Sequence, residues 1–176
     1  MKAKCPLCDD TGIYKNEVCI CVLKTIFDQK CPHLVNTPKS QNLLNNLLKG
    51  KISLDKNYLV KKSYQDANEL IATYAIYRLI KDQRLDIGFS NCIEAQDLIF
   101  DDGSSITQLE KPDILVYTLL GIKHKALPTF LYQAFQVRMM KNKQTFLLLA
   151  NPKAGRSLHN DYADLAPIIS EMEEIK

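Results

Sequence analysis

Apolar residues occur in this chain as short continuous runs that alternate with stretches of helical spacing. The runs predict buried strands at Tyr58–Val60, Ile87–Ser90, Ile114–Tyr117 and Thr145–Ala150. Apolar residues three or four positions apart predict a helix from Ser63 or Asp66 to Ile80, and further helices over Cys92–Phe100, Thr129–Lys141 and Asp164–Glu174. Apolar strands that alternate with helices are typical of a parallel sheet covered on both faces. We therefore predict a three-layer α/β domain over residues 57–176.

Two shorter segments precede this predicted domain. Residues 35–56 are rich in asparagine and read as a linker, although four leucines at helical spacing predict a short helix that ends at Gly50. Residues 1–34 contain most of the cysteines and form the third segment. A length of 176 residues suits one ordinary domain with a small appended module.

Four of the six cysteines lie within seventeen residues, as Cys5-Pro-Leu-Cys8 and Cys19-Ile-Cys21. Two short chelating pairs joined by a loop can supply the four tetrahedral ligands that Zn²⁺ prefers. Disulfides are the alternative, but they are rare in reduced compartments. Cys31 or His33 could replace Cys21 as the fourth ligand. Four thiolates leave no open coordination position, so we predict a structural zinc module over residues 1–34.

Composition and charge narrow the environment of the protein. The chain contains no apolar run of the roughly 20 residues that a membrane-spanning helix needs. Its first residues lack the apolar core of a signal peptide, so we expect a cytoplasmic protein. The net charge of +3 permits nucleic-acid binding without requiring it.

Several motifs resemble the bacterial replicative-helicase loaders of the AAA+ superfamily and their transposon-encoded relatives. Residues 5–14 with Cys19-Ile-Cys21 resemble the zinc module of these loaders, and Lys111–Gly121 resembles the Walker B strand. The helix Leu131–Arg138 resembles the next helix, which commonly carries an arginine near its end. Thr145–Asn151 resembles the sensor-1 strand and its terminal asparagine. The resemblance implies an AAA+ type of sheet and a role in DNA replication.

The departures from this family concern the nucleotide site. The phosphate-binding loop would occupy Val60–Leu70, which contains no glycine and carries Asp66 and Glu69. Tyr117 and Thr118 stand where the family has two acids, so nothing there is expected to hold Mg²⁺. The chain also stops where the family's helical lid would follow. We therefore expect a degenerate, non-enzymatic member that binds no nucleotide.

Besides an enzyme that would use the crevice of the α/β sheet for a small substrate, for which the sequence supplies no catalytic constellation, two functions remain open at this point. The first is a replication accessory protein, a pseudo-ATPase that acts as scaffold or inhibitor by binding a replicative helicase or another AAA+ subunit. The second is a zinc-dependent nucleic-acid-binding or transcription-regulating protein, possibly viral. For the second, Lys15 beside Tyr14 would contact single-stranded DNA. Lys141 and Lys143, in a basic cluster that begins at Arg138, would contact the phosphate backbone.

Overall fold

The computed structural model describes residues 4–19, 21–22, 25, 29, 56–60, 64–82, 86–91, 95, 106–119, 125–149 and 163–175. The chain divides into two compact units, one of residues 1–52 and 68–85 and one of residues 53–67 and 86–176. Each unit is described by itself. The predicted boundaries at residues 34 and 56 stay predictions.

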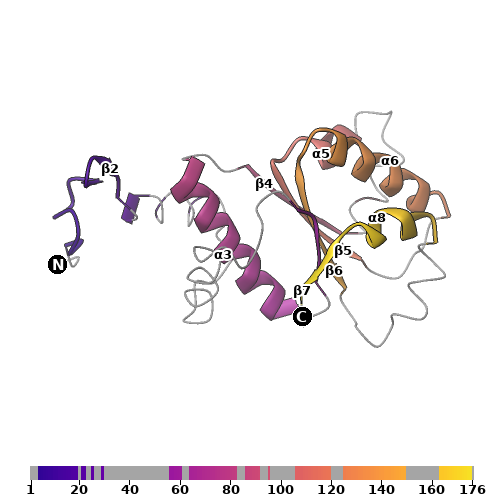
Figure 1. Cartoon of the computed structure of the whole chain (residues 1–176), viewed down its shortest axis with the longest axis horizontal. Coiled ribbons are helices and arrows are strands. Elements are labelled where there is room, and N and C mark those ends of the chain that lie inside the picture. The colour runs from indigo at the N-terminus through magenta and orange to yellow at the C-terminus, as the bar shows by residue number, and fades with distance from the viewer. Residues whose placement is uncertain are drawn as a thin grey trace. The chain divides into compact units, whose positions relative to one another are not determined.

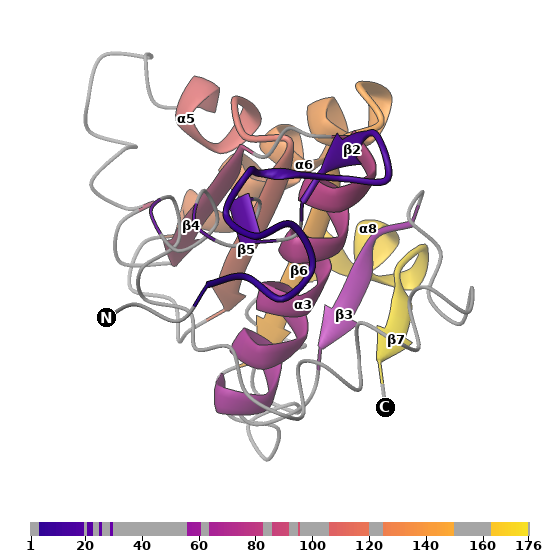
Figure 2. The same ribbon diagram turned by 90° about the vertical axis from the view of Figure 1, so that its left-hand side faces the viewer.

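The second unit is built on a parallel sheet of five strands. These are β3 (Tyr58–Val60), β4 (Ile87–Asn91), β5 (Ile114–Leu119), β6 (Gln144–Leu149) and β7 (Glu173–Ile175). They lie side by side in the order β4-β5-β6-β3-β7, and every neighbouring pair is parallel (Figure 2). The four predicted strands are confirmed, with ends that differ by at most two residues.

One face of the sheet packs against short helices and one long helix. α5 (Ile106–Glu110), α6 (Leu127–Met140), η2 (Ala163–Leu165) and α8 (Ala166–Ser170) all contribute buried side chains to the same core. Figure 1 shows α5, α6 and α8 on one side of the strands. The sheet contributes its odd-numbered residues to this core, among them Leu59, Leu115, Tyr117, Leu119 and Leu147.

The even-numbered residues of the central strands are buried as well. Tyr58 stacks on Phe146 across β3 and β6, with ring centroids 5.5 Å apart. All six residues of β5 are buried. A strand that is buried on both faces has no solvent side to alternate with, which explains why these strands are continuous apolar runs in the sequence.

α6 begins at Leu127, two residues before the predicted start, and Pro128 occupies its first turn, where a missing N–H costs nothing. At its other end Asn142 has a left-handed φ of 51°. The Asn142 N–H donates to the Met139 carbonyl at 3.0 Å, and the Lys143 N–H donates to the Arg138 carbonyl at 2.9 Å. These two bonds form a Schellman motif, which ends the helix and directs the chain into β6.

The first unit contains most of the helix α3 (Tyr64–Asp82) and a small hairpin near the N-terminus, drawn in indigo in Figure 1. α3 confirms the helix that the sequence predicts after β3. Its residues 69–76 are all buried. Thr73 Oγ1 donates to the Glu69 carbonyl at 2.8 Å, which satisfies a hydroxyl in this buried stretch.

Several sequence-based expectations need correction or lie outside the described residues. The helix predicted over Asp164–Glu174 is wrong in its last part: α8 ends at Ser170, and β7 pairs in parallel with β3. The backbone groups of β3 provide that pairing, which no local pattern announces. α5 was not expected from the sequence. The linker helix lies outside the described residues, as does the helix over Cys92–Phe100 except for Ala95.

Candidate functional site

The two cysteine pairs meet in the first unit. The sulfur atoms of Cys5, Cys8, Cys19 and Cys21 all lie within 4.8 Å of one another, and all four are free thiols. Cys5 Sγ is 3.8 Å from Cys19 Sγ, and Cys8 Sγ is 3.5 Å from Cys21 Sγ. A tetrahedral zinc ion with Zn–S bonds of about 2.3 Å needs sulfur atoms about 3.8 Å apart. The four predicted ligands are therefore spaced for one metal ion.

The first cysteine pair lies in a loop that its polar neighbours shape. The Cys5 N–H donates to Asp10 Oδ1 at 2.9 Å, and the Asp9 N–H donates to the Cys5 carbonyl at 3.0 Å. Asp9 and Asp10 both have left-handed φ values, 47° and 66°, which aspartate tolerates better than most residues. Thr11 Oγ1 donates to the Cys8 carbonyl at 2.6 Å. These contacts turn the chain so that Cys5 and Cys8 point to the same place.

A hairpin brings the second pair back to the first. β1 (Ile13–Tyr14) and β2 (Glu17–Val18) are antiparallel, and Tyr14 pairs with Glu17. Lys15 and Asn16 between them have φ values of 53° and 65°, as a two-residue type I′ turn requires. Beyond the hairpin, the Cys19 N–H donates to the Gly12 carbonyl at 2.8 Å. This hairpin was not expected from the sequence, because Lys-Asn is a weaker turn signal than Asn-Gly.

The clustered thiols perturb one another's ionisation. Burial alone would raise the pKa of Cys8. Hydrogen bonds from the Gly12 backbone and from the neighbouring thiols together outweigh burial and lower this pKa to about 7. The pKa of Cys21 rises to about 12, chiefly because of Cys8 and then Cys19. The Cys8 thiolate thus forms readily, and its presence opposes the ionisation of Cys21. A divalent cation would remove this opposition, since it attracts all four thiolates.

The four thiolates fit a structural zinc ion and would surround it completely. Such a site stabilises a fold and leaves no position for a substrate. The alternative ligands Cys31 and His33 lie outside the described residues, so the choice of the fourth ligand stays a prediction.

The carboxyl ends of parallel strands are where α/β sheets usually bind ligands. The register aligns Asn91, Thr118, Leu148, Val60 and Ile175 across all five strands, one row at this edge. Within the described residues this row carries no carboxylate. Tyr117, the residue before Thr118, is buried in the core with its ring 5.5 Å from that of Phe135. Asn151 and residues 61–63 lie outside the described residues.

Arg138 has no accessible surface, so it cannot belong to a basic surface cluster, and the sequence-based expectation is wrong at this position. Its guanidinium donates to the carbonyls of Leu109 at 2.9 Å, Pro112 at 2.8 Å and Gln144 at 2.5 Å. Nε donates to Thr145 Oγ1 at 2.9 Å. Burial lowers the pKa of Arg138 to about 10, against the opposing influence of Asp113 and Glu110, so the side chain is charged at neutral pH.

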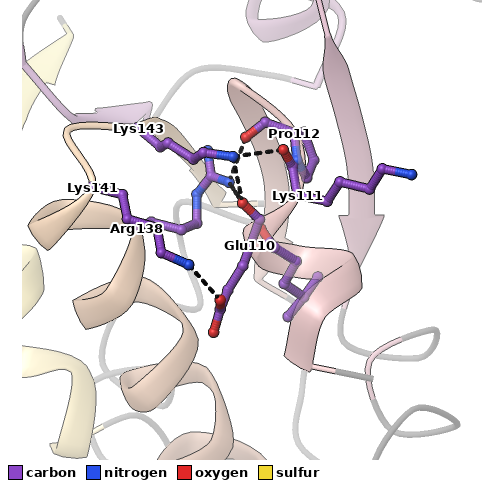
Figure 3. A network of polar contacts seen from close by, with 7 residues as sticks. Glu110, Lys111, Pro112, Arg138, Lys141 and Lys143 are labelled. Atoms are coloured by element: carbon purple, nitrogen blue, oxygen red, sulfur yellow. Dashed lines mark hydrogen bonds and ion pairs between the residues drawn. The ribbon is translucent and has the colours of Figure 1, made fainter. Parts of the chain in front are cut away.

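The two lysines proposed to contact DNA make contacts within the protein (Figure 3). Lys141 Nζ lies 3.1 Å from Glu110 Oε2 in an ion pair. Lys143 Nζ donates to the carbonyls of Glu110 at 2.9 Å and Lys111 at 2.6 Å. Both side chains hold the end of α5 against the turn between α6 and β6. Their role in nucleic-acid binding stays a prediction.

Lys15 lies far from this corner in the sequence, at the tip of the β1–β2 hairpin. Its Nζ is 5.3 Å from the centre of the Tyr14 ring, which is a cation–π distance. The same module exposes four large apolar side chains: Leu7, Ile13, Tyr14 and Val18. Exposed apolar groups concentrated on so small a module are typical of a surface that contacts another molecule.

Within the described residues no helix is long and apolar enough to cross a membrane.

Comparisons with known proteins complete the description of the site. No protein-family model and no curated protein sequence matches the chain. Among solved structures it is similar to domain III of the Thermotoga maritima replication initiation protein DnaA, with a TM-score of 0.51 and 11% sequence identity. The match covers 85% of this chain and 67% of that one. At such low identity the similarity concerns the fold alone, an α/β domain built on a parallel sheet.

Proposed function

We propose that this protein is a non-catalytic accessory protein of DNA replication. It would be a helicase-loader-like pseudo-ATPase that binds a replicative helicase or another AAA+ subunit and acts as scaffold or inhibitor. The observation that carries the proposal is an AAA+ type of sheet whose carboxyl edge lacks acidic residues at Tyr117 and Thr118. We include a role in replication because the structural neighbour is a replication initiation protein and because the motifs resemble helicase loaders.

The chemistry of phosphoryl transfer supports the absence of catalysis. That reaction needs Mg²⁺ on the phosphates, which an acidic residue at the end of the third strand normally helps to hold. Thr118 and its neighbours Asn91 and Leu148 offer no carboxylate there. The stretch Val60–Leu70 contains no glycine, so its backbone has less freedom to wrap around phosphates. Neither the stretch Val60–Leu70 nor the described end of β5 offers the groups that a nucleotide site needs, which supports the proposal.

The charge of the cysteine module favours a protein partner over nucleic acid. Residues 1–34 carry five lysines against three aspartates and one glutamate, a net charge of +1. A zinc ion held by four thiolates would contribute two negative charges, so the loaded module would carry one net negative charge. Such a module attracts phosphates little, whereas its exposed Ile13 and Tyr14 can enter an apolar patch of a protein. Lys141 and Lys143 are engaged with the α5 end, which weighs further against the nucleic-acid alternative.

Two binding experiments test the proposal. Titration with a fluorescent ATP analogue, up to millimolar concentration with Mg²⁺, should give no saturable signal, because Val60–Leu70 contains no glycine and the described row at the carboxyl edge carries no carboxylate. Native mass spectrometry with the replicative helicase of the source organism should give a zinc-containing complex. Saturable nucleotide binding would refute the pseudo-ATPase claim. A zinc-loaded, folded protein that binds no helicase or other AAA+ subunit would refute the scaffold claim.

A matched pair of variants examines the partner surface. Ile13→Ser with Tyr14→Ser should weaken the helicase complex and leave the zinc content unchanged, because both side chains are exposed and neither is a ligand. Gln133→Ser, an exposed change on α6, is the control and should leave the complex intact. Equal affinity of all three proteins would exclude this face of the module as the contact.

Nucleic-acid binding has its own test. Replacing Lys141 and Lys143 together by glutamine should leave the salt dependence of any DNA binding unchanged, since both ammonium groups already have protein partners. A slope that falls by about two in a log–log plot of affinity against salt would show that both contact phosphates and would favour the nucleic-acid alternative.

A further inference from the structure

A shallow groove of about 260 Å³ lies between α6 and α8. Figure 1 shows these two helices next to each other on the same side of the sheet. The lining residues are Tyr132, Gln136, Met139, Met140, Pro167, Ile168 and Glu171. None of them belongs to the cysteine module or to the carboxyl edge of the sheet, so the groove is separate from the sites described above.

The floor of the groove is apolar and adaptable. The four α6 residues follow one another at positions i, i+4, i+7 and i+8, which places them on one face of the helix. Met140 is 83% exposed, the most exposed large apolar side chain among the described residues. Methionine has a flexible, polarisable thioether and suits surfaces that adjust to a bound apolar group. Gln136 Nε2 donates to the Tyr132 hydroxyl at 2.6 Å, which leaves a polar rim beside the floor.

Glu171 is the charged residue that lines the groove, so the charge of the lining is negative. Lys141, which follows Met140, is turned toward Glu110 in an ion pair. Glu173 in turn pairs with Lys56. The α8 end of the groove therefore presents a carboxylate next to apolar surface, a combination that a basic amphipathic segment complements.

We propose that the groove between α6 and α8 binds an amphipathic helix of a partner protein. An apolar side chain of that helix would rest on Met139 and Met140, and a lysine or arginine beside it would pair with Glu171. The volume is below that of most small-molecule sites and suits one or two side chains. Glu171 disfavours nucleic acid and anionic membranes alike, because both carry negative charge. The inference does not depend on the proposed replication role.

A displayed library of helical peptides tests the groove and does not require the partner to be identified first. Selection on the full chain should enrich peptides with apolar residues three or four positions apart and an adjacent lysine or arginine. Their affinity should fall about tenfold for Met140→Ser and for Glu171→Lys, as expected when an anchor or its charge partner is lost. Gln108→Lys, which adds a charge at an exposed position of α5 (Ile106–Glu110) that does not line the groove, should leave the affinity unchanged.

Four outcomes would overturn the inference. One is a selection that yields no binding peptide, and another is a set of peptides whose affinity ignores both groove variants. A third is enrichment of acidic peptides. The fourth is concentration-dependent dimerisation of the wild type that Met140→Ser abolishes, because the occupant would then be a second copy of the chain. Both variants change exposed residues, so unaltered circular dichroism and thermal midpoints should verify that they fold. None of these results would alter the zinc or nucleotide experiments.

Discussion

Replacing the buried arginine of α6 is the sharpest test of how the second unit is held together. Arg138→Met keeps an unbranched side chain of similar length but removes every donor. The Arg138 guanidinium of the wild type joins α6 to the end of α5, to the turn before β5 and to the start of β6, through the carbonyls of Leu109, Pro112 and Gln144. In the variant, these three oxygen atoms lose their partner in a place where water does not replace it.

Two opposing contributions decide the size of the effect. Each carbonyl left without its donor costs about 1–3 kcal/mol. Removing the charge returns part of this, because burial lowers the pKa of Arg138 from 12.5 to about 10, and each pKa unit corresponds to about 1.4 kcal/mol. We therefore expect Arg138→Met to reduce the free energy of unfolding by about 3 kcal/mol. Arg138→Lys should lose at least as much, because lysine keeps the buried charge but cannot reach all three carbonyls.

Urea unfolding followed by far-UV circular dichroism measures these losses, and the absence of tryptophan makes this signal preferable to fluorescence. Lys141→Met is the control. It removes an exposed ion pair with Glu110, so the free energy of unfolding should change by no more than about 1 kcal/mol. The reasoning fails if Arg138→Met unfolds within about 0.5 kcal/mol of the wild type, a change typical of unremarkable surface positions. It also fails if Arg138→Lys retains full stability.

Three further predictions concern single positions. Gly88→Ala should destabilise the protein by about 1–3 kcal/mol, because the new Cβ would lie 2.3 Å from Pro112 Cγ. In urea unfolding, the double variant with Pro112→Ala should regain part of this loss, and additive effects of the two substitutions would contradict the contact. In the same assay, Asn142→Ala should lower the free energy of unfolding by about 1 kcal/mol, because residue 142 has a left-handed φ. Asn142→Gly should leave the free energy of unfolding unchanged, and equal effects of the two variants would exclude the helix cap. Cys8→Ser should abolish the one zinc ion per chain that we expect elemental analysis to find, while Cys92→Ser should keep it; zinc retained by both variants would refute the four-cysteine site.

The strands and the cluster of candidate metal ligands could be predicted from the sequence because each depends on short-range pattern. Two strands, Tyr58–Val60 and Ile114–Leu119, are buried on both faces. Such strands are recognisable in a sequence as runs of apolar residues. The four cysteines are two chelating pairs, and each pair is already local before the chain folds. The absence of acids at Tyr117 and Thr118 is likewise visible once the strand Ile114–Leu119 is recognised.

Only the tertiary structure decided the roles of the basic residues and of the C-terminal segment. Arg138 finds its carbonyl partners up to 29 residues away, and Lys141 meets Glu110 across 31 residues, so no local pattern separates these side chains from solvated ones. The segment Glu173–Ile175 has the composition of a helix end, yet it pairs with β3 over more than a hundred residues. Hydrogen bonding between distant backbone groups overrides weak local propensity. Without β7, β3 would be an edge strand, and β7 forms hydrogen bonds with the donors and acceptors along that edge.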